Sequence, residues 1–404
     1  MFYSVPMNRR STAAPDADQR VVASPLAQQF DQVRRQTHSL IEPLSAEDCQ
    51  LQSMPDASPA KWHLAHTTWF FETLVLLPYL RGYTVFDERW PRLFNSYYES
   101  LGPRHARPQR GLLSRPSFDE VKAYRAHVDA ALADLLPHAP ADALALIELG
   151  CHHEQQHQEL LLTDILHAFS CNPLLPAYDA AAPAKATAPE QVWLHHPGGI
   201  VNIGHGGDGF AFDNEGPRHP ALLAPFEISN RLVTCGEYAD FIDAGGYREP
   251  LLWLSDGWAA VQAQGWQRPA YWLPDGSVFG LHGVQALEPG APVMQLSFYE
   301  ACAFAEWAGA RLPTEFEWEA ACGLPAFAQA ADQAWQWTRS SYAPYPGFKP
   351  AAGAVGEYNG KFMVGQQVLR GGSLATPAGH ARTSYRNFFP PAARWQFSGV
   401  RLAR

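Results

Sequence analysis

The stretch ELGCHHEQQHQELLLTDILH, residues 148–167, places four histidines and three glutamates in a segment whose leucines otherwise follow helical spacing. In a helix, residues four apart lie on the same face, so His153 and His157 would stand one above the other. Two imidazoles at this spacing can bind one metal ion. The alternative interpretation is a polar helix face that carries no ligand.

A third imidazole is available in KWHLAHTTWFFE, residues 61–72, where His66 is a better candidate than His63. Helix bundles hold metal ions between facing helices, and three histidines leave coordination positions open for a substrate. Imidazole suits iron, zinc and copper alike, so the spacing does not choose the metal. We expect Glu159 to accept a hydrogen bond from a ligand imidazole rather than to bind the metal.

The composition excludes several classes of partner. The 404 residues carry a net charge of −10 without a run of lysine or arginine, which argues against nucleic acid or an anionic membrane as partner. We expect small-molecule substrates. No window approaches the roughly 18 apolar residues of a membrane helix, and no signal peptide is evident, so a cytoplasmic location is expected. Six scattered cysteines fit a reducing compartment.

The chain divides by pattern into four segments. Residues 1–23 are polar and are expected to be disordered, residues 24–175 form a helical bundle, residues 176–191 form a Pro/Ala-rich linker, and residues 192–404 form a loop-rich α+β domain.

Four segments of the first domain have apolar residues at helical spacing, which predicts a four-helix bundle. They are residues 24–44, 58–80, 117–136 and 141–169. Ser58 before Pro59, and Ser117 followed by Glu120, are helix start signals. The aromatic and arginine-rich connection 86–117 is long enough to be functional. In the second domain we expect helices at 234–243 and 297–308.

Both halves resemble one family. HLAH followed by HEQQH resembles the DinB-like iron-binding bundle of the sulfoxide synthases that make ergothioneine. GARLPTEFEWEAA, WQWTRSSYAPYPGF, VLRGGS and YRNFF with FSGVRLAR resemble the formylglycine-generating-enzyme fold, which is C-type-lectin-like and follows the bundle in those synthases. The resemblance covers nearly all of residues 24–404 and implies the fold class α + (α+β).

This resemblance implies an activity and a cofactor. The family holds Fe(2+) with three histidines, which match His66, His153 and His157 here. It coordinates hercynine through the imidazole and uses O2 to form a carbon–chalcogen bond at C2 of that ring. Gln156 matches the glutamine that hydrogen-bonds the other imidazole nitrogen.

Further substrate residues follow from the same resemblance. Asn387 and Phe388 match positions that hold the betaine portion of hercynine, and Tyr358 matches another tyrosine on the substrate side. An aromatic ring beside a trimethylammonium group is attractive through cation–π interaction. Packing in the core is the alternative role for Phe388.

The chain departs from the γ-glutamylcysteine-using members at two positions. Val355 replaces their catalytic tyrosine, and Phe389 replaces an acidic residue. A second branch uses a tyrosine pair in the long loop of the bundle, which matches Tyr97 and Tyr98. We expect one of them to donate a proton or hydrogen atom. The alternative is that both tyrosines pack at the domain interface.

The identity of the chalcogen donor rests on few residues. Arg104, Arg107 and Arg110 can bind anionic groups, including the carboxylate of cysteine. Aromatic faces in the stretch NFFPPAARW, residues 387–395, suit a sugar instead, and the acidic residue is absent at Phe389. The sequence interpretation therefore favours a selenosugar donor and selenoneine synthesis, with a cysteine-using hercynine sulfoxide synthase as the alternative.

Two more distant functions are weighed against this interpretation. A formylglycine-generating oxidase requires a cysteine pair near the C-terminal YR motif, and residues 380–404 contain no cysteine. A non-catalytic DinB-type metal-binding module would bind metal without consuming oxygen.

Overall fold

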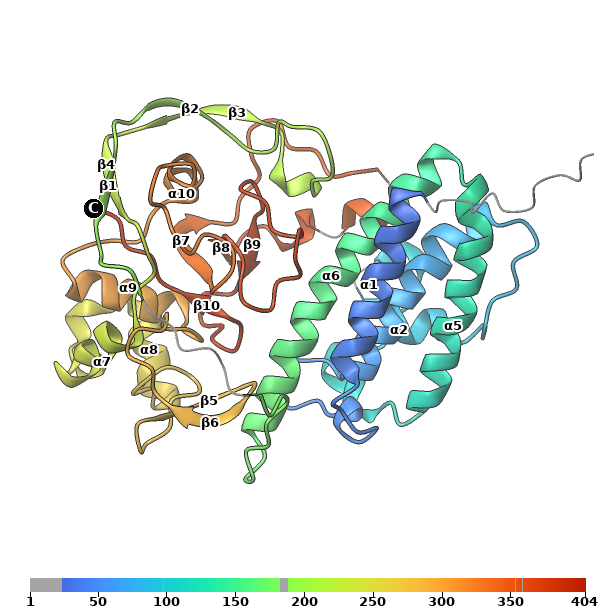
Figure 1. Cartoon of the computed structure of the whole chain (residues 1–404), viewed down its shortest axis with the longest axis horizontal. Coiled ribbons are helices and arrows are strands. Elements are labelled where there is room, and N and C mark those ends of the chain that lie inside the picture. The colour runs from blue at the N-terminus through green and yellow to red at the C-terminus, as the bar shows by residue number, and fades with distance from the viewer. Residues whose placement is uncertain (1–23, 97, 182–187, 353, 358) are drawn as a thin grey trace, which may run out of the picture.

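The computed structural model describes residues 24–96, 98–181, 188–352, 354–357 and 359–404. Tyr97 and Tyr358, two of the predicted site residues, lie outside the described residues. Figure 1 shows a helical half beside a half of short strands, short helices and loops. The expected fold class, a helical bundle followed by a loop-rich α+β region, is confirmed.

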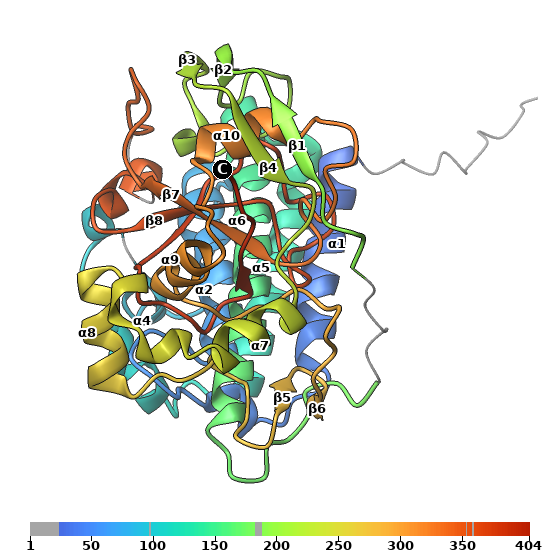
Figure 2. The same ribbon diagram turned by 90° about the vertical axis from the view of Figure 1, so that its left-hand side faces the viewer.

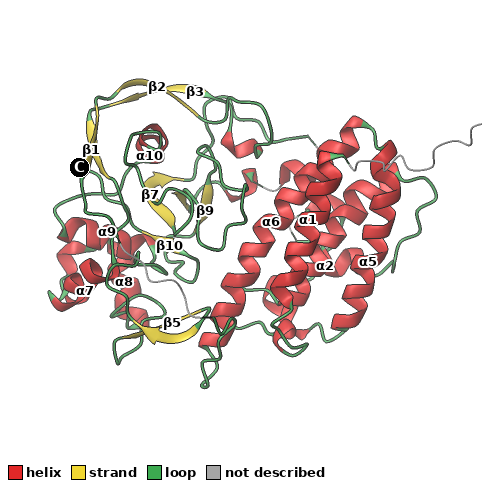
Figure 3. Cartoon of the chain, viewed as in Figure 1, coloured by secondary structure: helices red, strands yellow, loops and turns green. Residues whose placement is uncertain are grey.

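Four long helices form the helical half: α1 (Pro25–Ile41), α2 (Ala60–Phe71), α5 (Phe118–Leu135) and α6 (Ala141–Ser170). Helix α6 packs against α1 and α2, and α2 also packs against α5. The predicted four-helix bundle is confirmed (Figures 1 and 3). Helix α6 is the bundle helix that faces the second half (Figure 1).

The remaining helical segments extend or connect these four. Helix α2 continues through a π-helical turn into α3, and the long connection between α3 and α5 contains α4 and two 3₁₀ turns. Their bounds are Glu72–Leu76 for the π turn, Leu77–Tyr79 for α3, Trp90–Phe94 for α4, and Glu99–Leu101 and Arg107–Leu112 for the 3₁₀ turns.

One of the two predicted helix starts is confirmed. Ser117 accepts a hydrogen bond from the backbone N–H of Glu120, and the Glu120 carboxylate accepts one from Ser117 N–H, which is a capping box. The signal at Ser58 is wrong, because α2 begins at Ala60 and Pro59 occupies the cap position. Ser58 instead donates its backbone N–H to Asp164 on α6.

The second half is built from short strands in four small sheets. The largest sheet has the strand order β10-β7-β8-β9 (Figure 1), and the others are the antiparallel pairs β1-β4, β2-β3 and β5-β6 (Figure 2). The strands are β1 (Trp193–His196), β2 (Gly199–Ile203), β3 (His219–Leu223), β4 (Phe226–Ser229), β5 (Ser277–Gly280), β6 (Gly283–Ala286), β7 (Trp335–Ser341), β8 (Gln367–Arg370), β9 (Asn387–Phe389) and β10 (Ser398–Gly399).

Four helices belong to the second half: α7 (Cys235–Asp243), α8 (Ser255–Gln264), α9 (Phe298–Trp307) and α10 (Glu315–Ala321). Helices α9 and α10 pack on the largest sheet, and α7 and α8 pack on α9. Helices α7 and α9 confirm the two helices that the sequence predicts, whereas α8 and α10 were not predicted. Within the described part of the chain, no helix combines the length and apolar character needed to cross a membrane.

Candidate metal centre

Three buried histidines meet between α2 and α6. His66 from α2 and His153 and His157 from α6 each offer a ring nitrogen, and these three nitrogens lie within 4.8 Å of one another. The structure therefore brings together the three residues that the sequence analysis proposes as metal ligands.

A glycine lets the two helices approach closely enough for this. A Cβ atom at Gly150 on α6 would lie 2.4 Å from Cε1 of Phe71 and 3.0 Å from Cε1 of Phe70. Such distances are shorter than van der Waals contact, so any larger residue at position 150 would push α6 away from α2. His153 lies about one helical turn after Gly150, so it is on the face of α6 that approaches α2 closely.

His66 is held in one orientation. Its Nδ1–H donates to the carbonyl oxygen of Phe94 at 2.6 Å, while its buried Nε2 has no hydrogen-bond partner among the described residues. The ring lies between two indoles, with centroids 4.6 Å from Trp62 and 5.5 Å from Trp69 and nearly parallel planes. Nε2 is therefore the atom available to a metal.

His157 is held by a second histidine. Its Nδ1 lies 2.8 Å from Nδ1 of His63, whose Nε2 lies 3.0 Å from Oδ2 of Asp164. His63 thus lies behind His157 and outside the group of three, which agrees with the preference for His66 over His63.

Burial keeps these imidazoles neutral. It lowers the pKa of His153 to about 4, and it lowers the pKa values of His66 and His157 well below the ordinary value, with the neighbouring histidines adding to the effect. Neutral imidazole is the form that binds a metal ion. Three neutral imidazoles, one with a buried Nε2 that lacks a partner, fit a divalent transition metal with open coordination positions.

Glu159 does not have the predicted role. Its carboxylate accepts hydrogen bonds from Trp335 Nε1 at 2.8 Å, Ser373 Oγ at 2.5 Å and Thr376 Oγ1 at 2.7 Å, all in the second half of the chain. The expectation that it supports a ligand imidazole is therefore wrong. Glu159 instead connects α6 to the second half.

A buried ion cluster is centred on Glu154, the residue that follows His153. Glu154 is paired with Arg34 of α1 at 2.7 Å and with Arg125 of α5, and it accepts a hydrogen bond from Thr37. Arg34 also donates to Thr68 of α2. This network connects all four long helices next to His153.

A cavity of about 440 Å³ adjoins the metal centre and includes His153 and Tyr98 in its wall. Tyr98 is buried, and its ring lies 5.4 Å from the Trp69 ring, measured between centroids. Asn95 fixes the backbone of Tyr98 from both sides, because it accepts from Tyr98 N–H and donates to Tyr98 O. Tyr98 therefore has a defined position beside the centre.

A second cavity of about 220 Å³ lies between α6 and the second half and shares Phe212 and Asn359 with the first. It brings together five of the predicted substrate residues, which are Arg107, Gln156, Asn387, Phe388 and Phe389. The Gln156 amide donates to the Tyr385 hydroxyl at 2.6 Å, and the Phe388 ring stacks on Tyr342 with centroids 4.1 Å apart.

The predicted arginines separate into different roles. Arg104 pairs with Glu99 at 2.7 Å and lies outside both cavities. Arg107 lines the second cavity and donates to the carbonyl oxygen of Asp56. Arg110 is buried, with its guanidinium carbon 3.3 Å from the centroid of the Trp62 ring, so it packs behind the indole that stacks on His66.

Two residues of the second cavity were not singled out by the sequence analysis. His380 is buried, with Nδ1 3.2 Å from Oε1 of Gln155 and 3.3 Å from Nδ1 of His152. Tyr385 holds Gln156. Both lie far from α6 in the sequence, and neither has the spacing of a metal ligand. Only the YR motif, whose tyrosine is Tyr385, indicated a functional region.

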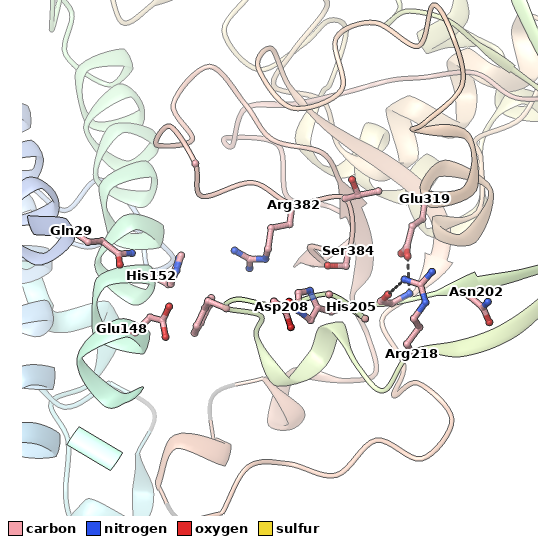
Figure 4. Close-up of a pocket in the computed structure, with 16 residues that line it drawn as sticks. Gln29, Glu148, His152, Asn202, His205, Asp208, Arg218, Glu319, Arg382 and Ser384 are labelled. Atoms are coloured by element: carbon pink, nitrogen blue, oxygen red, sulfur yellow. Dashed lines mark hydrogen bonds between the residues drawn. The ribbon is translucent and has the colours of Figure 1, made fainter. Parts of the chain in front are cut away.

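A third, more polar cavity of about 710 Å³ lies between the bundle and the second half, with Gln29 of α1 and His152 of α6 on one side and Arg382 on the other (Figure 4). Figure 4 shows Arg382 extending from the second half toward His152 on α6. The Phe210 ring stacks on His152 with centroids 3.9 Å apart, and both Phe210 and Glu148 also line the cavity beside the metal centre. Phe210 and Glu148 thus lie between the third cavity and the first.

Comparison with known families agrees with this division. Residues 29–161 match the DinB superfamily, and residues 177–329 match the sulfatase-modifying factor enzyme 1-like domain. The fold and the site together define a class of protein in which a DinB-type bundle with a three-histidine centre precedes a sulfatase-modifying-factor-like region.

Individual relatives identify the family more closely. Hercynine oxygenase from Mycolicibacterium thermoresistibile is 34% identical, covering 94% of each chain, and hercynine oxygenase from Mycolicibacterium smegmatis is 32% identical, covering 94% of this chain and 98% of its own. Ergothioneine biosynthesis protein 1 from Schizosaccharomyces pombe is 27% identical over 48% of this chain and 28% of its own length. The chain belongs to the hercynine oxygenase family.

Proposed function

We propose that this protein is an Fe(II)- and O2-dependent enzyme that forms a carbon–sulfur bond at C2 of the hercynine imidazole. The observation that carries the proposal is the buried centre of His66, His153 and His157 beside two adjoining cavities. The relatives named hercynine oxygenase, which cover 94% of the chain, supply the substrate and the class of chemistry.

The three histidines would hold the iron. When bound, iron supplies the one-electron chemistry with O2 that closed-shell organic substrates do not undergo readily by themselves. The three imidazoles come from the bundle, and a cavity lined by His153 and Tyr98 adjoins them. Both substrates can therefore be held at one site, which removes much of the entropic cost of their encounter.

We assign the two ends of hercynine, the imidazole and the trimethylammonium group, to side chains that line the second cavity. Gln156, positioned by Tyr385, would hydrogen-bond the imidazole nitrogen that is not bound to metal. Phe388, stacked on Tyr342, offers an aromatic face to the trimethylammonium group, and Asn387 precedes it on β9. We keep Tyr358 as a proposed substrate residue on the family resemblance alone.

Proton delivery is assigned to the tyrosine pair. A buried phenol in the wall of the cavity that includes His153 can give a proton to a nearby reacting group, and Tyr98 meets this condition. Tyr97 remains the other candidate, by the family resemblance.

For the donor, the comparisons favour sulfur over the selenosugar that the sequence interpretation preferred. The names of the relatives include hercynine and ergothioneine, and none mentions selenium. Arg107 in the second cavity can bind the carboxylate of cysteine. One observation keeps the selenosugar as the second candidate: Phe389 and Trp395 pack edge to face in the same cavity and present flat surfaces suited to a sugar.

A competition experiment tests both candidates. The purified protein, reconstituted anaerobically with Fe(II), receives hercynine, O2, and an equimolar mixture of cysteine, γ-glutamylcysteine and a 1-seleno-sugar, and products are identified by mass. We expect a sulfur adduct of hercynine from the wild-type protein and none from His153→Ala, which loses one of three imidazoles. A selenium adduct alone would establish the second candidate. No adduct from any donor would contradict the proposed function.

A further inference from the structure

A chain of three side chains leads away from the metal centre. Asp164 Oδ2 lies 3.0 Å from Nε2 of His63, and Nδ1 of His63 lies 2.8 Å from Nδ1 of His157. All three are buried. His63 comes from α2, whereas the other two come from α6 and are seven residues, or about two helical turns, apart.

The carboxylate decides where the protons lie in this chain. An ionised carboxylate only accepts hydrogen bonds, so His63 must present Nε2–H to it, and the remaining nitrogen of a neutral His63 is then an acceptor. His157 must therefore donate Nδ1–H to His63. This leaves the lone pair of His157 on Nε2. The opposite arrangement would direct the lone pair of His63 at Asp164 and place a proton on the Nε2 of His157.

The orientation of the carboxylate is itself fixed. Asp164 Oδ2 also accepts the backbone N–H of Ser58 at 2.8 Å, and the Ser58 hydroxyl accepts a hydrogen bond from Arg110 at 2.9 Å. The rings of Trp62 and His63 also contact each other in a T-shaped arrangement, with centroids 5.8 Å apart and an interplanar angle of 77°. The ring of His63 therefore has little freedom to turn away from His157.

We propose that Asp164 and His63 form a hydrogen-bonded relay that fixes His157 as an Nε2 metal ligand and strengthens its electron donation. The relay deepens the proposed function, because it acts on the same metal centre. His63 and Asp164 are positioning residues, since neither belongs to the group of three nitrogens. Outer groups of this kind orient the ligand ring and raise its basicity, and their loss typically weakens metal binding about 10–100-fold.

The test compares two substitutions of nearly equal size. His63→Leu fills the space but has no hydrogen-bond acceptor, whereas His63→Asn places an amide oxygen near the position of the lost Nδ1. We expect His63→Leu to bind Fe(II) and Co(II) about 10–100-fold more weakly than wild type and to shift the visible Co(II) absorption. His63→Asn should regain most of this affinity. A pure packing role predicts the reverse order.

A second pair of variants avoids any change at His63. Asp164→Asn keeps an oxygen for Ser58 N–H but removes the charge. Asp129→Asn also removes a carboxylate charge, but Asp129 pairs with Arg34 at a distance of 2.7 Å and does not belong to the relay. We expect weaker metal binding from Asp164→Asn and wild-type affinity from Asp129→Asn, with thermal melting as the folding check.

The outcomes separate the two proposals. Wild-type affinity in His63→Leu, equal loss in His63→Leu and His63→Asn, or an unchanged Asp164→Asn would overturn the relay. Because the probe is the metal alone, without hercynine or O2, these results do not depend on which product the enzyme forms. Failure of the proposed function would appear instead as the lack of an adduct from wild-type protein that binds metal normally.

Discussion

At the scale of single residues, two of the three candidate ligands are oriented by groups outside the centre. His66 donates Nδ1–H to the Phe94 carbonyl oxygen, and Nδ1 of His157 contacts His63. Both arrangements direct Nε2 toward the shared space, as expected for histidines whose second nitrogen sets the ligand tautomer. Spacing predicts which histidines share a helix face, but the partner of each second nitrogen depends on the fold.

Tyr98 allows a residue-scale test of proton delivery. We expect Tyr98→Phe to bind Fe(II) and hercynine like wild type, because the ring that packs on Trp69 is retained. Bond formation should fall by roughly 10²-fold or more relative to oxidation of the thiol donor, which is the usual range for loss of a general acid. Product ratios measured by mass spectrometry check this.

The control for this test is Tyr97→Phe. If Tyr98 is the donor, Tyr97→Phe should keep the wild-type product ratio. The assignment to the pair is wrong if both single variants and the double variant keep that ratio. A lower melting temperature of Tyr98→Phe with an unchanged product ratio would show that the hydroxyl serves packing alone.

At the scale of elements, one N-cap motif with a preceding arginine occurs twice in the second half. RLVTCGE (residues 231–237) and RLPTEFE (residues 311–317) each place a threonine at the N-cap of a helix and a glutamate three residues later. In both, the arginine makes two hydrogen bonds to that glutamate, at 2.8 and 2.8 Å in the first and 2.8 and 2.7 Å in the second. The motif thus joins each helix start to the strand or loop that precedes it.

Because Glu317 can be protonated, the contribution of this motif to protein stability should depend on pH. Burial raises its pKa, but the hydrogen bonds from Arg311 and Thr314 outweigh burial, and the pKa lies below the ordinary value. Its contribution to stability is therefore present above the ordinary value of about 4.3 and is lost as the pH falls through the lower folded-state pKa.

We expect Glu317→Gln to lose about 1.5–3 kcal/mol of unfolding free energy at pH 7, the range for hydrogen bonds to a charged group. The difference from wild type should shrink as the pH falls below about 4.3. Urea denaturation at several pH values measures it. The exposed Glu306 of α9 serves as control, since Glu306→Gln should change little. A difference that stays constant down to pH 2 would contradict the argument.

Gly150 tests the contact between α2 and α6. Alanine normally favours a helix over glycine by about 1 kcal/mol, yet here its Cβ would overlap Phe71. We expect Gly150→Ala to destabilise the protein by about 1–3 kcal/mol, as overpacking usually does, and to weaken metal binding by moving His153. Thermal melting and metal titration check both effects.

The second-site variant Phe71→Leu should restore part of the stability of Gly150→Ala, because it removes the ring that the new methyl group meets. Gly323→Ala is the matched control, since its Cβ would meet nothing within 4 Å. Equal stability of Gly150→Ala and wild type would show that α6 can shift without cost.

At the scale of the whole molecule, the bundle and the pair of His153 and His157 were predictable because both depend on helical periodicity within single segments. The third histidine lies on another helix, and the choice of His66 over His63 came from the family resemblance. The second half was predicted less completely. Helix α10 has only seven residues, and most strands have three to five, which is too short for a clear periodic pattern. Contacts between the halves, such as Gln156 with Tyr385, join residues 229 positions apart, and no local pattern encodes them.

Glu159 shows how such a contact can control the site. Its carboxylate accepts three hydrogen bonds from the second half, and it lines the second cavity together with Trp335. Removing it would leave three donors without their acceptor, and each unsatisfied buried donor costs about 1–3 kcal/mol. The second half would then shift relative to α6, and with it the aromatic wall opposite Gln156.

We therefore expect Glu159→Ala to keep metal binding, because His66, His153 and His157 all belong to the bundle. The KM for hercynine should rise roughly tenfold, equivalent to about 1.4 kcal/mol, with a smaller change in kcat. Glu159→Gln is the matched control, because its amide oxygen can still accept from Trp335 and Ser373, and its NH2 group can donate to the hydroxyl oxygen of Thr376. Steady-state kinetics and metal titration measure these effects. Loss of metal binding in Glu159→Ala would show that the centre depends on the second half, and an unchanged KM would show that the cavity does not depend on this contact.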